Sequence, residues 1–467
     1  MAAEGGPGPT CVLGIDLGTT SVKAALLPGT EPGLALAQSC SRETRAHSDR
    51  PGAAPQGMEQ DVQKIIRALN ECLAALPQQQ LQQVTHIGIS GQMHGVVFWK
   101  SDKGCKWSES GRGPAFEPDR VSHLVTWQDG RCSPTFLTSL PLPQSHVSLA
   151  TGFGCATVFC PDFLKAYDAA GTIQDYVVAM LCDLKKPLMS VQNAASWGYF
   201  NCRNKSWNTD ILRKSSFPVH LLPEVGDPGS IAGRTTCAWH GIPKGAKVGI
   251  ALGDFQCSVY SCLTERTDAV LNISTSAQLT ISMPLGFQPP EAPDPSSAVT
   301  YFPYFNGDYL AVAASLNGGN VLATFVGMVA QWAQELGFQV QESAIYPRII
   351  QAALAQKHSK LSVHPTIFGE RHLPELLASV SSIGASELSL GHVTRALCRG
   401  LVENLCSMLP VQHLEELGVR RVLGSGSALA RNEVLRQEVE RIFPFPVVYG
   451  KDVDAAVGAA MVMFHSK

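Results

Sequence analysis

The stretch GIDLGTTSVKAALL, residues 14–27, decides the fold because it places an acid beside a hydroxyl-rich turn between two apolar segments. Apolar side chains alternate over residues 12–16 and again over residues 22–26, which predicts two half-buried strands joined as a hairpin. The acid and the turn are formed by Asp16, Gly18, Thr19 and Thr20. Turns favour these residue types for backbone reasons alone. Their N–H groups, hydroxyls and carboxylate would also suit phosphate oxygens and a magnesium ion, so this stretch leaves both interpretations open.

A second hairpin of this kind follows after about 250 residues, an interval typical of a domain. In AVLNISTSAQLTISM, residues 269–283, two apolar strands are predicted to join through Ser274, Thr275 and Ser276, without an acid. Two domains that each offer a hydroxyl-rich turn indicate a ligand held between them, with its negative charges facing both turns. Two unrelated hairpins with ordinary turn residues are the alternative.

The composition is typical of a compact, turn-rich α/β enzyme. The chain has 467 residues, of which 45% are hydrophobic and 16% charged, with 42 glycines and 30 prolines. This length predicts two or three domains, each able to bury a core. Thirty-six basic and thirty-nine acidic side chains give a net charge of −3 without a basic run. We therefore expect no nucleic acid partner.

The ends and the cysteines indicate a cytosolic protein. The N-terminal residues MAAEGGPGPT carry neither a basic region nor an apolar stretch, and no segment of the chain approaches about 18 uninterrupted apolar residues. We expect residues 1–10 to form a flexible tail, and we expect neither secretion nor a membrane span. The 14 cysteines are scattered without C-x-x-C or a cluster with histidine. They are expected to be reduced thiols, and zinc is not indicated.

The order of predicted elements is that of an α/β fold. Apolar residues recur at helical spacing over residues 60–76, which predicts an amphipathic helix. Residues 84–99 read as strand, glycine turn and second strand, and residues 247–253 read as an apolar strand that runs into a helix. Strands that alternate with helices in this way favour a layered α/β architecture.

Asp254 follows the apolar strand and begins that helix, at a position where the sites of α/β proteins form. The positive end of the helix is expected to keep its carboxylate ionised. A carboxylate near a substrate hydroxyl is what phosphoryl transfer requires of its base. Its alternative role is that of a helix N-cap, which is compatible with catalysis.

A glycine-rich turn, Gly424-Ser425-Gly426-Ser427, connects a predicted strand to a helix near the carboxyl end. Such a turn can bring backbone N–H groups close to a nucleotide. It is not a P-loop, and Leu429 stands where a dinucleotide fingerprint needs its third glycine. A plain strand-to-helix turn is an equal alternative.

Eight motifs occur in the order found in the FGGY carbohydrate kinases, and the chain resembles that family over nearly its whole length. The motifs are GIDLGTTSVKAALL, MEQD, GQMHG, WQDGR, GDFQ, the hairpin around STS, FGER and GSGSALARN. The resemblance implies an α/β fold of two ribonuclease-H-like domains, of the actin/Hsp70/sugar-kinase type, around an interdomain cleft. It implies an N-terminal sugar-binding domain over residues 11–262 and a C-terminal ATP-binding domain over residues 263–467.

The resemblance also implies roles for individual residues, with ATP and Mg²⁺ as cofactors. Asp254 falls on the family's catalytic base. The residues expected to contact the sugar are Gln92, Met93, His94, Asp129 and Asp254. Those expected to contact ATP are Thr19, Thr20, Thr275, Gly424, Ser425 and Asn432, while Asp16 would help hold magnesium. Apart from the motif, His94 is a single histidine near an apolar strand, a position more typical of a structural residue.

The activity implied by the resemblance is ATP-dependent phosphorylation of the terminal primary hydroxyl of a ketose. Sedoheptulose is the expected substrate and sedoheptulose 7-phosphate the product, which would feed the pentose phosphate pathway. Xylulose is the alternative substrate. A protein that uses ATP only to change shape is an alternative from another class, which Asp254 and the sugar-contacting motif disfavour.

Two departures from the family pattern leave a catalytically silent, ligand-binding form open. GFGCATVFC runs directly into Pro161, where the family usually has a helical segment, and Val191 stands where the family commonly has Asp. Restoring both features would then raise the melting temperature or the rate. The expected partners are ATP and a small ketose, with no membrane; the sequence does not indicate an oligomeric state.

Overall fold

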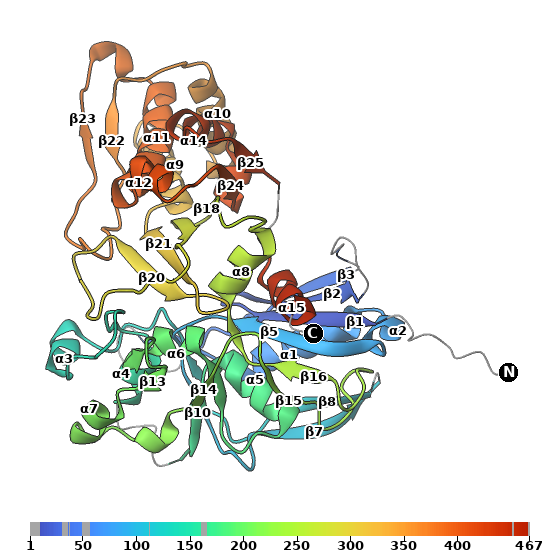
Figure 1. Cartoon of the computed structure of the whole chain (residues 1–467). Helices are drawn as coiled ribbons and strands as arrows, with labels where there is room; N and C mark the ends of the chain where they lie inside the picture. Colours follow the sequence, from blue (N-terminus) through green and yellow to red (C-terminus); the bar gives the residue numbers. More distant parts are fainter. Residues whose placement is uncertain are drawn as a thin grey trace.

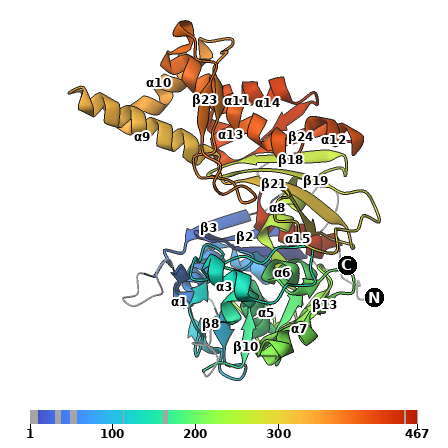
Figure 2. The same cartoon turned by 90° about the vertical axis from the view of Figure 1, so that its left-hand side faces the viewer.

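The computed structural model describes residues 10–29, 36, 38–48, 57–111, 113–159, 166–450 and 453–465. We call the described part of residues 10–253 the first lobe and that of residues 263–450 the second lobe. Figures 1 and 2 show the two lobes one above the other, with a short layer of helices between their sheets. Residues 1–9 of the tail predicted over residues 1–10, and Pro161, lie outside the described residues.

The first lobe is built on a sheet with the strand order β15-β16-β5-β1-β2-β3, and β17 also pairs with β5. The predicted hairpin forms its centre, because β1 and β2 pair antiparallel while β1 and β5 pair parallel. The strands of this sheet are β1 (Cys11–Leu17), β2 (Ser21–Pro28), β3 (Gln38–Glu43), β5 (Val84–Gly91), β15 (Ile231–Arg234), β16 (Lys247–Gly249) and β17 (Leu252–Gly253). Every residue of β1 is buried, so the prediction of a half-buried strand is wrong for β1, because it has a neighbouring strand on each side and helices on its faces.

The second lobe repeats this pattern in a sheet with the order β20-β21-β19-β18-β24-β25. Its central hairpin is again antiparallel, and its first strand, β18, pairs parallel with β24. The strands are β18 (Asp268–Ile273), β19 (Ala277–Ser282), β20 (Val299–Pro303), β21 (Tyr309–Ser315), β24 (Arg421–Ser425) and β25 (Val447–Tyr449). The shared topology confirms that the two hydroxyl-rich hairpins occupy equivalent places in two similar sheets.

Two helices lie between the sheets, α8 (Asp254–Cys262) and α15 (Ala455–His465). They approach the first sheet closely because small residues line the contact. A Cβ atom added at Gly14 would lie 1.8 Å from the carbonyl oxygen of Ala456, and one added at Gly458 would lie 1.9 Å from that of Cys257. On its other side α8 packs Val259 against apolar residues of the second sheet. The end of the chain thus returns to the first lobe, although it belongs to the predicted C-terminal domain.

The other elements cover the outer faces of the two sheets. In the first lobe they are β4 (Glu59–Gln60), α1 (Val62–Ala75), α2 (Gln78–Leu81), β6 (Val97–Trp99), β7 (Cys105–Ser110), β8 (Gly113–Pro118), β9 (Leu124–Val125), α3 (Pro134–Ser139), α4 (Gly154–Val158), β10 (Ala169–Gly171), α5 (Ile173–Cys182), β11 (Leu188–Ser190), α6 (Val191–Trp197), β12 (Phe200–Asn201), β13 (Ser206–Trp207), α7 (Thr209–Lys214), η2 (Val219–Leu221) and β14 (Glu224–Gly226). In the second lobe they are α9 (Gly319–Glu335), α10 (Glu342–Leu354), β22 (Ser362–His364), β23 (Ser379–Ser381), η3 (Ala385–Glu387), α11 (Leu390–Met408), α12 (Val411–Glu416), α13 (Ser427–Arg431) and α14 (Glu433–Ile442).

The predicted local elements are present, with two interruptions. The helix expected over residues 60–76 is α1, which begins after Asp61, whose side chain accepts a hydrogen bond from the N–H of Gln63. The strand expected over residues 247–253 is divided into β16 and β17, and the helix after the turn at 424–427 is divided into α13 and α14. The cysteines of the described ranges are all free, and no described helix is long and apolar enough to cross a membrane.

Candidate active site

A cavity of about 280 Å³ opens between the two lobes and is lined by residues from both. The first lobe and α8 contribute Thr19, Met93, His94, Trp127, Asp254 and Phe255, and the second lobe contributes Ser276, Gln278, Thr300, Phe302, Val312, Ala314 and Arg371. The structure therefore brings together predicted residues from three separate motifs. Trp127 and Arg371 line the same cavity and were not predicted individually, although both belong to motifs that the sequence displays, WQDGR and FGER.

Two buried acidic residues, Asp16 and Asp254, lie close enough for the charge of Asp16 to affect the protonation of Asp254. Burial raises the pKa of Asp16, while Lys23 opposes that rise and the hydroxyl of Ser90 donates to its Oδ1 at 3.2 Å. Burial, and then the charge of Asp16, raise the pKa of Asp254. The N–H of Phe255 donates to Asp254 at 2.7 Å.

The expectation that the helix start keeps Asp254 ionised is wrong for this structure. The N–H of Phe255 and the helix start do favour the charged form. Burial and a neighbouring like charge outweigh them, because both make a second negative charge costly in this place. The N-cap alternative does not hold either, since Asp254 is the first residue of α8 and Gly253 occupies the N-cap position.

The carboxyl groups of Asp16 and Asp254 are compatible with a magnesium ion that is bound together with ATP. Asp16 and Asp254 are buried carboxyl groups with raised pKa values, and a nearby cation would lower the cost of ionising them. Within the described ranges no group of three His, Cys, Asp or Glu side chains could hold a metal by itself. Magnesium bound with a nucleotide needs only one or two carboxylates besides the phosphates, so Asp16 suits it.

The turn of the first hairpin is held from behind by other motifs. The carbonyl of Thr19 accepts a hydrogen bond from the side chain of Gln60 at 2.7 Å, and its hydroxyl accepts one from the Trp127 indole at 3.0 Å. Thr20 is exposed, and its carbonyl accepts from the N–H of Thr44 at 2.9 Å. These contacts fix the backbone of the turn and leave its front open to the cleft.

The motif predicted to contact the sugar follows β5, and its residues Met93 and His94 line the same cleft. Gln92 is buried, its amide nitrogen donates to Gln60 at 3.0 Å, and its Oε1 has no partner among the described residues. A buried acceptor without a partner is costly, but Gln92 is not among the residues that line the cleft, so its predicted contact with the sugar stays a prediction. Met93 is buried against Gly253, next to Asp254.

The ring of His94 is oriented by two contacts. Its Nδ1 lies 2.8 Å from the carbonyl oxygen of Ser196, and the ring stacks on Phe153 at 4.4 Å between centroids. A carbonyl only accepts, so Nδ1 carries the proton and Nε2 is left as an acceptor. Burial lowers the pKa of His94 to about 4, which keeps the ring neutral. His94 thus presents a fixed acceptor to the cavity that it lines.

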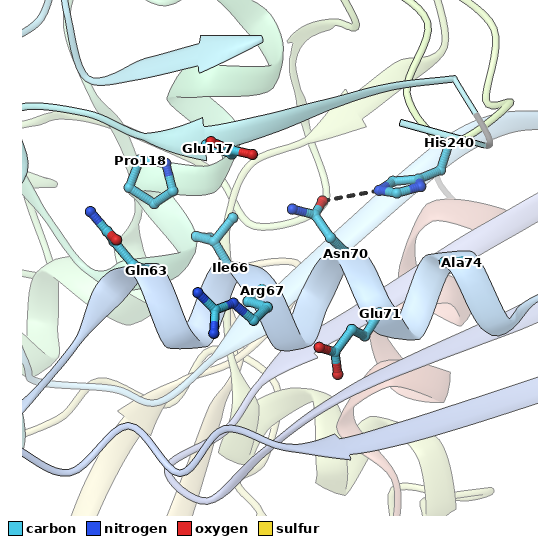
Figure 3. A pocket seen from close by; sticks show the side chains of 10 residues that line it. Gln63, Ile66, Arg67, Asn70, Glu71, Ala74, Glu117, Pro118 and His240 are labelled. Carbon is cyan, nitrogen blue, oxygen red and sulfur yellow. Dashed lines mark hydrogen bonds between the residues drawn. The ribbon is translucent and has the colours of Figure 1, made fainter. Parts of the chain in front are cut away.

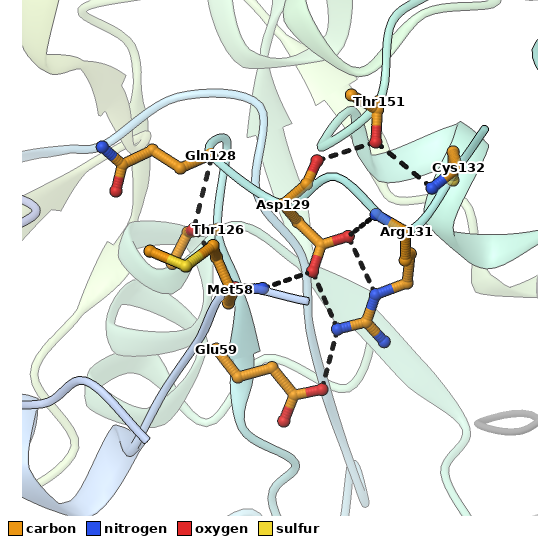
Figure 4. Close-up of polar contacts among 8 residues, drawn as sticks. All are labelled: Met58, Glu59, Thr126, Gln128, Asp129, Arg131, Cys132 and Thr151. Atoms are coloured by element: carbon orange, nitrogen blue, oxygen red, sulfur yellow. Dashed lines mark hydrogen bonds and ion pairs between the residues drawn. The ribbon is translucent and has the colours of Figure 1, made fainter. Parts of the chain in front are cut away.

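Asp129, predicted to contact the sugar, lies behind the cavity wall, where it organises neighbouring segments (Figure 4). It is fully buried, and its carboxylate accepts from the N–H groups of Met58 and Arg131 and from the Arg131 guanidinium at 2.8–3.0 Å. Arg131 also donates to Glu59 at 2.8 Å. With its oxygens occupied, Asp129 is absent from the residues that line the cleft, and Trp127 of the same motif takes that place.

A second cavity, of about 590 Å³, lies at the carboxyl ends of β18 and β24. Its lining includes the predicted residues Gly424 and Ser425, together with Ser274, Arg436 and Tyr449. The Arg436 guanidinium carbon lies 5.8 Å from the centre of the Tyr449 ring, a pairing that the sequence did not reveal. A cavity lined by an aromatic ring, an arginine and backbone-exposing glycines could take an aromatic base.

The two cavities meet at the second hairpin turn, since Ser274 lines one and Ser276 lines the other. Thr275 is exposed between them, and its carbonyl accepts from the N–H of Asn320 at 3.1 Å. Phosphates that connect a base in the larger cavity to the cleft would pass over this turn.

Asn432 lies inside the second lobe and not on either cavity. It is fully buried, its side-chain oxygen accepts from the N–H of Leu435 at 3.0 Å, and its nitrogen lies 3.5 Å from the sulfur of Cys398. It therefore caps α14, and its predicted contact with ATP stays a prediction that this arrangement does not support.

Val191 is buried in an apolar cluster at the start of α6. The side chains of this cluster are apolar, and a carboxylate placed among them would lose its hydration. Val191 thus fits its surroundings as a valine.

A further cavity, of about 480 Å³, lies on the outside of the first lobe between α1 and β8 (Figure 3). The side chain of Asn70 bonds His240 there at 3.0 Å. None of the predicted site residues lines it, so the candidate site is the cleft between the lobes.

The fold and the cleft define a two-lobed sugar kinase of the actin/Hsp70-like class. A model of the N-terminal domain of the FGGY family of carbohydrate kinases matches residues 11–106. Mouse and human proteins named sedoheptulokinase are 66% and 65% identical over 459 and 461 residues, which is 97% of this chain and 96% of each relative. The chain therefore belongs to the FGGY family of carbohydrate kinases, and it is a carbohydrate kinase, as predicted.

Solved structures share the fold at low sequence identity. Xylulose kinase from Rhodospirillum rubrum superposes with a TM-score of 0.78 at 18% identity, over 97% of this chain and 89% of that one. Glycerol kinase from Plasmodium falciparum, crystallised with ADP, gives a TM-score of 0.71 at 15% identity, over the same shares. These likenesses confirm the predicted fold class.

Proposed function

We propose that this chain transfers the γ-phosphoryl group of ATP to the terminal primary hydroxyl of sedoheptulose, forming sedoheptulose 7-phosphate. The observation that carries the proposal is the identity of 66% to a protein named sedoheptulokinase over 97% of the chain. The site supports it, because Asp254 and His94 line one cavity with the turns of both hairpins. A cytoplasmic location and a place in pentose phosphate metabolism belong to the same proposal.

Asp254 acts as the general base in the proposed reaction. It accepts the proton of the sugar hydroxyl as the oxygen bonds to the γ-phosphorus and the bond to the β,γ-bridging oxygen breaks, releasing ADP. Its raised pKa suits this role, because a base is most effective when its pKa lies near the working pH. Magnesium bound with ATP would neutralise the charge of the phosphate oxygens, with Asp16 on the protein side.

The remaining residues position the two substrates. His94 Nε2 and Gln92 Oε1 accept hydrogen bonds from sugar hydroxyls, since both are oriented by other protein contacts. The turns at residues 18–20 and 274–276 offer N–H groups and hydroxyls to the phosphates from opposite sides. Closure of the lobes over these groups excludes water, which would otherwise compete for the phosphoryl group.

The alternatives are xylulose as substrate and a silent form that binds ligands only. The xylulose kinases with solved structures are distant, at 18% identity. A panel of sedoheptulose, xylulose, ribulose, fructose and glycerol, each with ATP and magnesium, separates these possibilities. We expect the highest kcat/KM with sedoheptulose. Faster xylulose turnover would favour the first alternative, and binding without sugar-dependent ADP release would favour the second.

A further inference from the structure

Arg371 reaches the cleft from the second lobe, and its side chain forms no hydrogen bond or ion pair within the part of the chain that the structure describes. It lines the cavity that also contains Asp254 and His94, and its side chain is solvent-exposed. Among the described residues that line this cavity, it is the one cation. None of the described residues forms a hydrogen bond or an ion pair with its guanidinium. An arginine fixed in a cleft without a carboxylate partner is available to an anionic ligand.

The backbone beside Arg371 is held in place by the buried residue Glu370. The Glu370 carboxylate is 1% exposed and receives a dense set of donors from the end of β21 and from α11. These are the hydroxyl of Ser315 at 2.6 Å, the N–H of Leu316 at 3.1 Å and the side-chain amides of Asn317 and Asn404 at 2.9 and 2.8 Å. Asn317 also donates to the carbonyl of Gly369 at 2.8 Å. Since the Glu370 oxygens are occupied in this way, Glu370 anchors the turn without a hydrogen bond to Arg371, and burial lowers the pKa of Arg371 while the charge of Glu370 opposes that shift.

The charge of Arg371 acts on the sugar-contacting side of the cleft. It contributes to the lowered pKa of His94, after the larger effect of burial, so the two groups interact across the gap between the lobes. The other cation near the acidic pair, Lys23, lies 3.8 Å from Asp454 and is already paired. The cavity between the lobes thus has the carboxyl group of Asp254 and the guanidinium of Arg371 in its lining.

We propose that Arg371 binds the phosphoryl group in transit and stabilises the negative charge on its oxygens during transfer. This inference rests on the proposed function. The transferred group carries charge on three oxygens, and catalysis of its transfer consists mainly of positioning and charge stabilisation. Arg371 keeps its proton throughout, while Asp254 receives the proton of the hydroxyl. Asp254 lies on α8 between the sheets and Arg371 comes from the second lobe, so the proposed site combines side chains from separate parts of the chain around one cavity.

The test compares Arg371→Gln and Arg371→Lys with Arg348→Gln. Arg348 is an exposed arginine on α10, so its variant makes the same change of charge in the same lobe but outside the cleft. The measurements are kcat and KM for the sugar, the Kd of the sugar without nucleotide, and the Kd values of ATP and ADP. Melting temperatures show whether each variant is folded.

We expect Arg371→Gln to lower kcat by on the order of 10²–10³, the usual effect of losing one preorganised group in the transition state. The Kd of the sugar should stay within about twofold, and the lysine variant should recover part of the loss. The affinity for ATP should fall relative to that for ADP, because only ATP carries the transferred group.

Three results would overturn the inference. The first is a kcat of Arg371→Gln within about twofold of that of Arg348→Gln. The second is a weaker sugar Kd with unchanged kcat, which would make Arg371 a sugar ligand. The third applies if the wild-type protein phosphorylates none of the sugars: the proposed function then fails, and an unchanged ratio of ATP to ADP affinity rejects the role of Arg371 separately.

Discussion

Replacing Asp254 with Asn removes the proposed base while preserving its shape. The asparagine oxygen can still accept the N–H of Phe255, which lies 2.7 Å from the carboxylate oxygen. The variant also removes a carboxyl group whose ionisation the nearby charge of Asp16 makes more costly. We therefore expect Asp254→Asn to fold and to bind ATP and sugar.

The expected loss of turnover follows from the removal of the proton acceptor. Without a proton acceptor, turnover should fall by about 10²–10⁴, the usual contribution of general base catalysis. At about 1.4 kcal/mol per tenfold change, this corresponds to about 3–5 kcal/mol of transition-state stabilisation. The loss should appear in kcat and not in KM, because an interaction made only in the transition state is removed.

A coupled assay of ADP release measures both parameters with sedoheptulose and MgATP. The matched control is Asp210→Asn, since Asp210 lies at the surface on α7 with a side chain 89% exposed. The control should retain wild-type kinetics. A kcat for Asp254→Asn within about threefold of the control, in a folded protein, would reject Asp254 as the base.

Three further predictions come from the same residues. The folded-state pKa values of Asp16 and Asp254 are raised, so the stability due to their protonated forms is present below about pH 4 and lost as the pH rises through the raised values. Asp254→Asn removes this loss for one of the two groups, and its melting temperature should therefore exceed that of the wild type increasingly from pH 5 to pH 9. A constant difference in thermal scans would contradict this. The turns at residues 18–20 and 274–276 must approach each other before both touch the phosphates. Small-angle scattering should therefore give a smaller radius of gyration with sugar and a non-hydrolysable ATP analogue than without ligands. Unchanged scattering at saturating ligand would count against an interdomain site. Val191→Asp should lower the melting temperature, because the carboxylate would enter an apolar cluster; a higher value would instead support the expectation that Asp belongs at this position.

The family and the residues expected at the site could be predicted from the sequence, but the contacts and burial of those side chains could not. The motifs around His94 and Asp254 were sufficient to predict that both face one cleft, and the cavity lining agrees. The role of Asp129 was harder to predict, because its carboxylate is occupied by Met58 and Arg131, and Met58 is remote in the sequence. A motif indicates which residues lie near a site without indicating which way each side chain points.

The sequence by itself determined the two hairpins and the helix α1, because alternation of period two and recurrence at 3.6 residues are properties of neighbouring residues. It also carried enough ordered motifs to predict the family. Three features depend on the tertiary structure: α15 returns to the first sheet, Asp254 is shifted toward its protonated form beside Asp16, and Arg371 lines the cleft. The physical reason is that burial and electrostatic interaction depend on distances between segments far apart in the chain, and local patterns do not record those distances.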